Sequence, residues 1–229
     1  MKLLVLLAII APLVAACAPA PEPDEPQDAE AEAPIDEPPG FTLIGNRFRP
    51  LTWDEMTDAQ KTMVAHILDG PRTALGGPFN VLLRSPEMGD MVQEVGAYAR
   101  YNSSLTGKLR EMSIIMTARF WTAQFEWNAH KNAALQEGLD PAIIDAIATG
   151  QRPAAMDLDE AVIYDFVTEM LYDKRVGDGT FEAAIGALGE RGVVDVIGTV
   201  GYYSLVSMLL NVDEYPLPEG VEPELQPLD

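Results

Sequence analysis

The chain has 229 residues, of which 36 are acidic and 15 basic, and its formal net charge is −21. Because phosphate recognition needs a basic surface, this balance argues against nucleic acid as a partner. Cys17 is the only cysteine, so an intramolecular disulfide is excluded and no dithiol is available for redox chemistry inside the fold.

Residues 1–16 have the pattern of a signal peptide. A lysine near the start is followed by 14 apolar residues, which would span about 21 Å as a helix, short of the ~30 Å core of a membrane. The small residues Val14-Ala15-Ala16 before Cys17 resemble the lipobox of bacterial lipoproteins. Since Ala18 follows, and not the aspartate of an inner-membrane retention signal, we expect a lipid anchor at Cys17 in the outer membrane, facing the periplasm. The alternative is an ordinary secretory signal with a chance cysteine.

Residues 17–40 are rich in proline and acidic residues and contain no basic residue. Such a segment can bury little apolar area and repels itself, so it is predicted to be a disordered tether. Its eight acidic residues leave a net charge of about −13 for the rest of the chain. Residues 41–218 are expected to form one helical domain, and residues 219–229, proline-rich and acidic again, a flexible tail.

The domain is predicted to be all-α, a helical bundle, because apolar residues recur at helical spacing and no stretch alternates as a strand does. Helix starts and stops are marked by caps such as Thr52, Ser85-Pro86 and Gly138. Helices are expected over 53–68, 85–101, 105–121, 123–137, 140–149, 157–173, 179–188 and 191–211, with a short apolar segment over 79–83.

Two of these helices carry further expectations. In the helix over 85–101, the side chains predicted to face inward are Met88, Met91, Val92, Val95 and Tyr98. The helix over 191–211 is apolar almost all round, which is typical of a helix that is central or lies at a subunit contact.

The strongest chemical signal is the pair Glu126 and His130, four residues apart on one predicted helix. That spacing places a carboxylate and an imidazole on one face, and aromatic neighbours on both sides of Glu126 could provide the dry surroundings that make a carboxyl a usable acid. The bland alternative is an exposed ion pair, which is common on helices. Glu111, on the preceding helix, could join them, and the three side chains could also bind zinc. We expect neither a metal nor a cofactor, since there is no HExxH and the other histidine, His66, has the setting of a surface or structural residue.

Three motifs in order resemble the carboxymuconolactone decarboxylase family. They are Gly77-Pro78-Phe79-Asn80 with Leu83 to Glu87, the run Arg110 to His130, and Gly201-Tyr202-Tyr203. The resemblance spans about residues 51–218. It implies an all-helical fold like that of alkyl hydroperoxide reductase D, built round a helical hairpin, and assembly into homo-oligomers, trimers or hexamers, with sites near subunit contacts.

The thiol branch of that superfamily has a CxxC motif with a histidine four residues after the second cysteine and a glutamate twelve before the first. Glu111 and His130 match the glutamate and the histidine, but Ala123 and Glu126 stand at the cysteine positions. Neither residue forms a thiolate or a disulfide, so a thiol peroxidase cycle is not expected.

The other branch resembles lactone decarboxylases, which use acid–base groups on the same scaffold. On that resemblance, Glu111, Glu126 and His130 would be catalytic, with His130 or Glu126 delivering a proton and Glu111 orienting the histidine. Arg119 and Trp121 would bind the substrate, and the guanidinium of Arg119 would pair with a carboxylate of that substrate. The expected function is decarboxylase-type acid–base chemistry on a small organic acid or lactone. The alternative is a non-enzymatic binding or assembly module on the same fold, and the predicted envelope location, away from cytoplasmic catabolism, leaves the substrate open.

Overall fold

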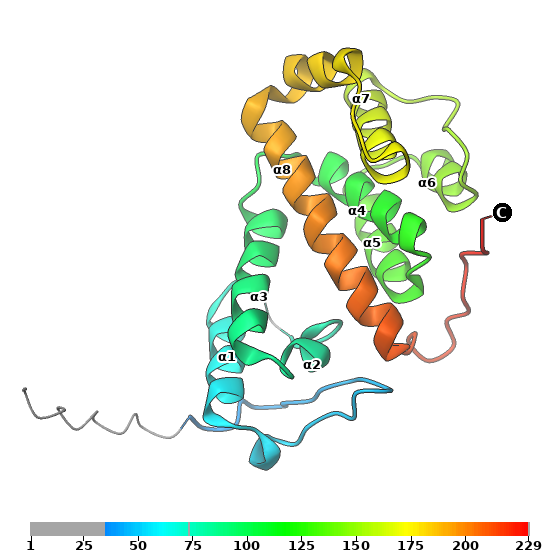
Figure 1. Cartoon of the computed structure of the whole chain (residues 1–229). Helices are drawn as coiled ribbons and strands as arrows, with labels where there is room; N and C mark the ends of the chain where they lie inside the picture. Colours follow the sequence, from blue (N-terminus) through cyan, green and yellow to red (C-terminus); the bar gives the residue numbers. More distant parts are fainter. Residues whose placement is uncertain (1–34, 73, 229) are drawn as a thin grey trace, which may run out of the picture. The chain divides into compact units, whose positions relative to one another are not determined.

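The computed structural model describes residues 35–72 and 74–228. The predicted signal peptide, the lipidation site Cys17 and most of the predicted tether lie outside the described residues. The described part of the chain belongs to one compact unit and contains helices but no strand, which confirms the all-α prediction (Figure 1). In chain order the elements are the 3-10 turn η1 (Trp53–Glu55), α1 (Asp58–Asp69), α2 (Phe79–Leu82), α3 (Pro86–Tyr101), α4 (Gly107–Trp121), α5 (Gln124–Gln136), α6 (Pro141–Ala148), α7 (Leu158–Thr168), the π-helical turn η2 (Glu169–Asp173) and α8 (Asp178–Asp213).

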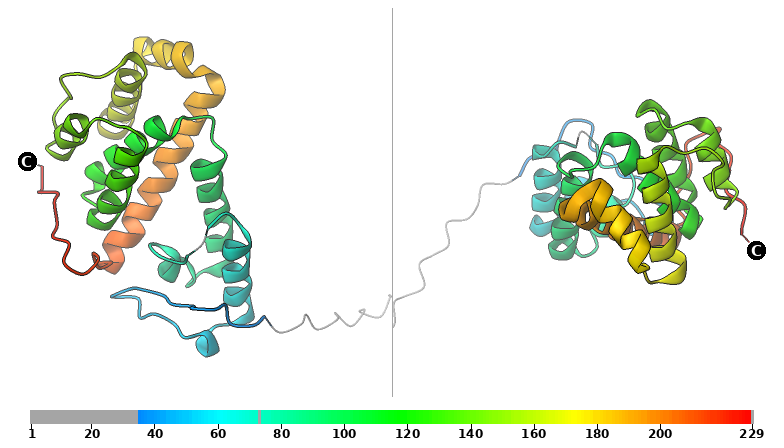
Figure 2. Two further views of the ribbon diagram at one scale, coloured as in Figure 1. Left: turned by 180° about the vertical axis from the view of Figure 1, so that it is seen from behind. Right: turned by 90° about the horizontal axis from the view of Figure 1, so that it is seen from above.

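The bundle is organised around α4. This helix packs against α5, α6, α7 and α8, while α3 lies between α8 and α1 (Figures 1 and 2). α4 and α5 form a tight helical hairpin: Thr122 ends α4 in the left-handed conformation at φ 49°, and α5 begins two residues later. The expected hairpin is therefore present, and α5 runs back antiparallel to α4.

Local capping decides where the helices begin. The helix predicted over 53–68 is divided, because Thr52 and Glu55 form one capping box and Thr57 and Gln60 form a second that restarts the chain as α1. The helix predicted over 157–173 ends as α7 at Thr168 and continues as the π-helical turn η2.

α8 is one long helix with a break inside it. Gly189 has φ 68° and ψ 171°, a conformation outside the helical region, so the predicted separation between the helices over 179–188 and 191–211 falls at this residue. By length and composition α8 could cross a membrane, yet 56% of its most apolar window is buried inside the protein. Its packing on α4, α3 and α7 is that of a core helix.

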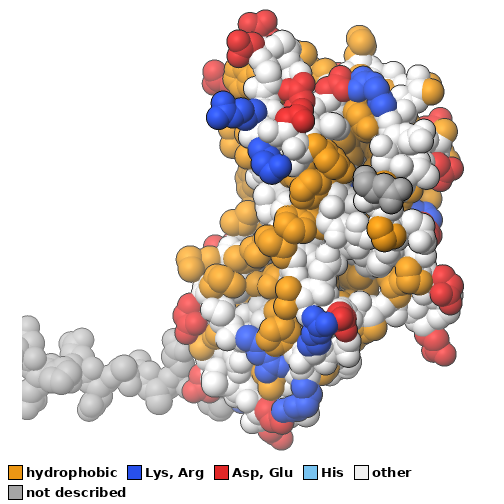
Figure 3. All heavy atoms as spheres, turned by 45° about the vertical axis from the view of Figure 1, so that its right-hand side comes forward, with side chains coloured by type: hydrophobic (Ala, Val, Ile, Leu, Met, Phe, Trp, Pro, Cys, Tyr) orange, Lys and Arg blue, Asp and Glu red, His pale blue; other side chains and the backbone are white. Residues whose placement is uncertain are grey.

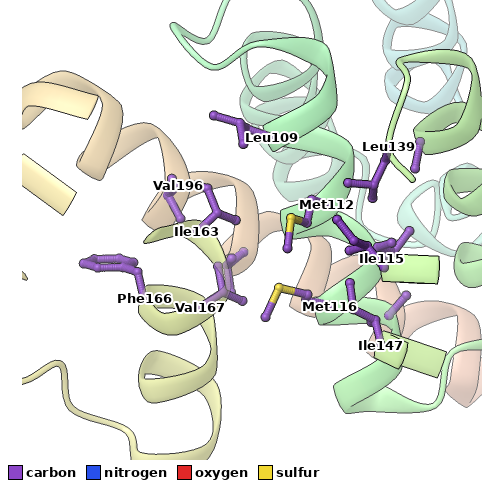
Figure 4. Packing of buried hydrophobic residues seen from close by; sticks show 14 of the residues in the cluster. Leu109, Met112, Ile115, Met116, Leu139, Ile147, Ile163, Phe166, Val167 and Val196 are labelled. Atoms are coloured by element: carbon purple, nitrogen blue, oxygen red, sulfur yellow. The ribbon is translucent and has the colours of Figure 1, made fainter. Parts of the chain in front are cut away.

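The main hydrophobic core lies between α4, α6, α7 and α8 (Figure 4). Met112, Ile115, Ile163 and Val196 meet there and are each 0% exposed. A second cluster joins α1, α2 and the segment before them, around Trp53, and a third surrounds Tyr202 and Tyr203 on α8. This third cluster forms part of the wall of the site.

The inward face predicted for α3 is wrong except at Val92, which is partly buried and packs against the second and third hydrophobic clusters. Met88, Met91, Val95 and Tyr98 are 42–64% exposed. The buried face consists of Gly89, Gln93, Gly96 and Ala99. A Cβ on Gly96 would lie 2.2 Å from the Tyr202 ring, and one on Gly89 would lie 2.7 Å from the Leu82 carbonyl oxygen. The helix therefore packs through its small residues, because only they allow this close approach, and its large side chains face outward.

The C-terminal segment, predicted to be a flexible tail over 219–229, packs on the hairpin in its described part. Leu225 is 3% exposed in the main core, and its backbone exchanges two hydrogen bonds with the Gln124 side chain, at 2.7 and 3.1 Å. Trp127 Nε1 donates to Glu224 at 3.0 Å. One apolar anchor and these polar contacts hold a segment whose composition alone suggested disorder.

Candidate active site

The hairpin brings Glu111 and His130 into direct contact. His130 Nδ1 lies 2.6 Å from Glu111 Oε2, and the two residues are 8% and 2% exposed. Their separation of 19 positions is bridged because α4 and α5 run antiparallel from the turn at Thr122. The bond occupies Nδ1, so Nε2 is the ring nitrogen left to exchange a proton with other groups.

The charge state of Glu111 favours this arrangement. Burial acts to raise the pKa of its carboxyl, but the hydrogen bond and charge of His130, together with Arg110 at 3.3 Å, outweigh burial and lower the pKa. Glu111 is therefore an ionised acceptor at neutral pH. It orients the imidazole and stabilises the imidazolium when the ring takes up a proton.

Glu126 has the opposite character. It is 2% exposed, its Oε2 accepts a hydrogen bond from Ser207 Oγ at 3.1 Å, and its Oε1 has no hydrogen-bond partner among the described residues. Burial raises the pKa of this carboxyl well above its ordinary value, and the Ser207 hydrogen bond only partly opposes the rise. Burial therefore favours the protonated form of Glu126, which is the form that can act as an acid.

Glu126 and His130 line the same cavity, of about 120 Å³. It lies between α5, α8 and Gly76-Gly77-Pro78 before α2, which we call the glycine loop. Tyr203 packs edge-on against the His130 ring with the ring centroids 4.8 Å apart. Burial raises the pKa values of Tyr202 and Tyr203, so both present neutral hydroxyl groups. The glycine loop is held in position by a hydrogen bond from the Gly77 amide to Tyr215 Oη at 3.0 Å. Gly77 has φ 76°, a conformation that favours glycine.

Two arginines in the cavity wall were not among the predicted site residues. Arg72 is 9% exposed and donates from Nη1 to the Gln93 carbonyl at 3.3 Å, whereas Arg100 is exposed at the end of α3. Neither belongs to a motif, and they lie far from Glu126 in sequence. The one feature of the sequence that could have pointed to them is their position: Arg72 precedes the glycine loop, and Arg100 is near the end of a predicted helix. Together they make the cavity suited to an anion.

Arg119 and Trp121, the predicted substrate-binding residues, are not brought to this cavity. Arg119 is 2% exposed, donates from Nη2 to the Gln226 carbonyl at 2.7 Å, and lines a different cavity between α4, α6 and α7. The Trp121 carbonyl accepts a hydrogen bond from Asn211 at 2.8 Å, and its ring packs on Phe120. Neither residue lines the cavity that contains Glu126 and His130.

The zinc alternative finds no support in this geometry. Within the described ranges no group of three histidine, cysteine or acidic side chains is placed to hold a metal ion. The carboxyl of Glu126 is bound to Ser207, and Nδ1 of His130 is bound to Glu111. His66 lies on α1 with its side chain 53% exposed, in contact with Asp90 at 2.7 Å.

The all-helical fold and the α4–α5 hairpin agree with the known family and the solved structures to which this chain is similar. Residues 86–161 match the model of the carboxymuconolactone decarboxylase family. An uncharacterized peroxidase-related protein from Ralstonia eutropha JMP134, described as an alkylhydroperoxidase AhpD core, superposes with a TM-score of 0.61 at 14% identity, over 76% of this chain and 92% of that one. A protein of unknown function from Agrobacterium tumefaciens, whose description names AhpD and antioxidant defence, superposes with a TM-score of 0.50 at 15% identity, over 62% and 97%. No curated protein sequence matches.

The chain is thus similar to the carboxymuconolactone decarboxylase family over residues 86–161, and it has an AhpD-like helical fold. The matched segment includes all three of Glu111, Glu126 and His130. At the positions that the thiol branch gives to cysteine, this chain has a fully buried alanine, Ala123, and Glu126, whose carboxyl pKa is raised by burial.

Proposed function

We propose that this protein is a lipid-anchored envelope protein whose helical domain performs decarboxylase-type acid–base chemistry on a small organic acid or lactone. The observation that carries the proposal is the composition of one cavity: a carboxyl that burial keeps protonated, a histidine held by a second carboxylate, and two arginines. Carboxyl groups with perturbed pKa values beside a histidine are typical of active sites.

In this proposal Arg72 and Arg100 hold the carboxylate of the substrate, which explains their place in the wall of the cavity. Loss of carbon dioxide leaves the bonding electrons on carbon as an enolate-like carbanion, which needs charge stabilisation and a proton. Glu126 or the imidazolium of His130 supplies that proton, and solvent then restores it. The hydroxyl groups of Tyr202 and Tyr203 are donors to the developing oxyanion.

Peroxidase activity is a less favourable proposal. The Ralstonia protein is described as peroxidase-related, but likeness at 14% identity concerns the fold. Thiol peroxide reduction needs a thiolate and a partner thiol, and Cys17, the only cysteine, lies outside the described domain.

The test is carbon dioxide release from a panel of small β-keto acids and carboxylated lactones. We expect Glu126→Gln and His130→Ala each to lower kcat by a factor of about 10² or more, as loss of a general acid or base does. The matched controls are Glu94→Gln and His66→Ala, which change the same residue types at exposed positions.

Turnover that is unchanged in Glu126→Gln and His130→Ala would exclude acid–base catalysis at this cavity. Binding of a panel member, with affinity lowered by Arg72→Met but no product formed, would instead support the alternative, a non-enzymatic binding module. The two outcomes are distinguished by measuring both binding and carbon dioxide release on the same variants.

The proposed lipid anchor is tested separately. Palmitate incorporation and globomycin-sensitive processing are expected for the full chain and should be lost in Cys17→Ser. Cleavage and release that do not depend on Cys17 would indicate simple secretion.

A further inference from the structure

A second cavity is lined in part by α4 and is separate from the Glu126 site. It has a volume of about 180 Å³, is enclosed by α4, α6, α7 and η2, and shares no lining residue with the first cavity. Arg119 is its one charged lining residue in the described part of the chain. Nothing in the acid–base proposal uses this cavity, so a ligand bound here would be independent of that chemistry.

The guanidinium of Arg119 has unused donors. The residue is 2% exposed, and its one described hydrogen bond runs from Nη2 to the Gln226 carbonyl. Its Nε and Nη1 atoms are buried and have no partner among residues 35–72 and 74–228. Arginine remains charged in proteins, and a buried cation with unsatisfied N–H groups is costly unless an anion or a polar group meets it.

The walls of the cavity define the rest of the ligand. Most of the lining is apolar, with Met116, Ile147 and Leu171, and the polar groups beside them are the hydroxyls of Tyr164, Thr168 and Tyr172. The volume corresponds to about six molecules of liquid water, enough for a small organic molecule. A single cation in an apolar cavity fits a ligand that has one negative charge and an apolar remainder.

We propose that this cavity binds a small organic monocarboxylate, whose carboxylate accepts hydrogen bonds from the unpartnered N–H groups of Arg119. The aliphatic and aromatic walls bury its apolar part, and Tyr172, which is 46% exposed, lies at the opening. Charge-assisted hydrogen bonds of this kind are about twice as strong as neutral ones.

One competitor is the chain itself. The side chain of Leu228 lies 2.8 Å from the position that a Cβ on Gly150 would take, so the segment after α8 reaches the rim of the cavity. The next residue in the sequence, Asp229, is acidic. The experiment therefore has to distinguish a free carboxylate from one supplied by the chain.

The experiment is calorimetric titration of the full chain with benzoate at millimolar concentrations, with benzamide as the neutral probe of the same shape. We expect saturable binding of benzoate, and binding at least tenfold weaker for benzamide. Leu171→Trp, which fills the cavity without touching the charge, should weaken benzoate binding at least tenfold, and so should Arg119→Met. Leu158→Trp, at a position 86% exposed, is the matched control and should bind as the parent does.

Arg72→Met shows which of the two cavities binds benzoate. Because it changes only the first cavity, it should leave benzoate binding at the Arg119 site unchanged. The proposal is overturned if benzoate shows no saturable binding, if benzamide binds equally well, or if binding is lost in Arg72→Met and kept in Leu171→Trp. It is also overturned if Asp229→Asn strengthens benzoate binding tenfold or more, since a carboxylate of the chain itself would then occupy the cavity. If Arg119→Met fails to fold, Leu171→Trp still decides the matter.

Discussion

At the scale of single residues, Glu111 and Glu126 show how position sets the state of a carboxyl. Both are 2% exposed and both lie on the hairpin. Glu111 has a histidine and an arginine beside it, which lower its pKa, whereas Glu126 has one serine hydroxyl, and burial dominates. The two pKa values are therefore shifted in opposite directions, which favours the ionised form of Glu111 and the neutral form of Glu126 and suits them to the roles of orienting group and acid.

The neutral state of Glu126 predicts a stability signature. Because its pKa is raised in the folded state, the folded protein keeps this proton at pH values where the unfolded chain has lost it. The carboxyl thus lowers the free energy of unfolding progressively as pH rises above about 4.5, its ordinary value. Glu126→Gln removes this cost, so urea denaturation should show the variant to be more stable than the parent at pH 8, by at least about 1 kcal/mol.

The advantage of Glu126→Gln should shrink toward zero near pH 4, where both states hold the proton. Glu94→Gln, at an exposed position on α3, is the control and should show no such trend. A difference that stays the same from pH 4 to pH 8 would mean that Glu126 ionises normally, and the acid role would lose its basis.

Residue chemistry was visible in the sequence where it was local. Glu126 and His130 are one helical turn apart, and Glu111 was joined to them through a resemblance that the hairpin confirms. Arg72 and Arg100 were missed because their place in the cavity depends on how α3 and the glycine loop pack on α8. Arg119 was given a role in the site because it is close in sequence, although its side chain lines a different cavity.

At the scale of elements, caps made most helix boundaries predictable, but the packed face of α3 was not. Periodicity alone assigned its inner face to the large apolar side chains, since burial usually follows hydrophobicity. The two glycines on the other face allow α3 to approach Tyr202 and Leu82 more closely than any larger residue would. That preference appears only when the neighbouring helices are in place, so a single amphipathic pattern could not reveal it.

Gly96 is therefore expected to tolerate no side chain. In Gly96→Ala the new Cβ would lie 2.2 Å from the Tyr202 ring, so either α3 or Tyr202 has to move. Overpacking of this kind costs about 1–3 kcal/mol, and a thermal or urea denaturation measurement should show a loss of that size. Since Tyr202 lines the first cavity, ligand binding there should weaken as well.

The control for Gly96→Ala is Gly186→Ala, also inside a helix but with nothing within 4 Å of the added Cβ. Alanine is the better helix former, so this variant should be as stable as the parent or up to about 1 kcal/mol more stable. Equal losses in both variants would show that the close approach of α3 to α8 does not matter for stability.

At the scale of the whole molecule, the outward side chains of α3 are the feature that the domain leaves uncovered. Met88, Met91, Val95, Tyr98 and Tyr101 are 42–64% exposed and lie along one face of the helix. Tyr98 also bonds to Asp195 at 3.0 Å, which joins this stripe to the exposed apolar residues Val194 and Ile197 on α8. Hydrophobic side chains also form a band across the face drawn in Figure 3.

An apolar stripe of this extent on a domain with a large net negative charge is best explained by association. We propose that a second copy of the chain covers the stripe on α3, as the homo-oligomers implied by the family resemblance would require. Light scattering should then give a multiple of the mass of one chain. Replacing Met91 and Val95 together by glutamate should yield single chains, because burying the two charges would cost several kcal/mol.

Leu158→Glu adds the same kind of charge at an isolated position that is 86% exposed, and it should leave the assembly intact. A parent chain that is monomeric at all concentrations, or an assembly that survives the double substitution, would contradict a contact through α3. The assembly also bears on the proposed chemistry, since Arg100 lies over the Tyr101 ring at 5.7 Å, between the stripe and the first cavity. A partner packed on Tyr101 would hold Arg100 in place, so the Met91 and Val95 double variant should bind carboxylates in that cavity more weakly even though no cavity residue has changed.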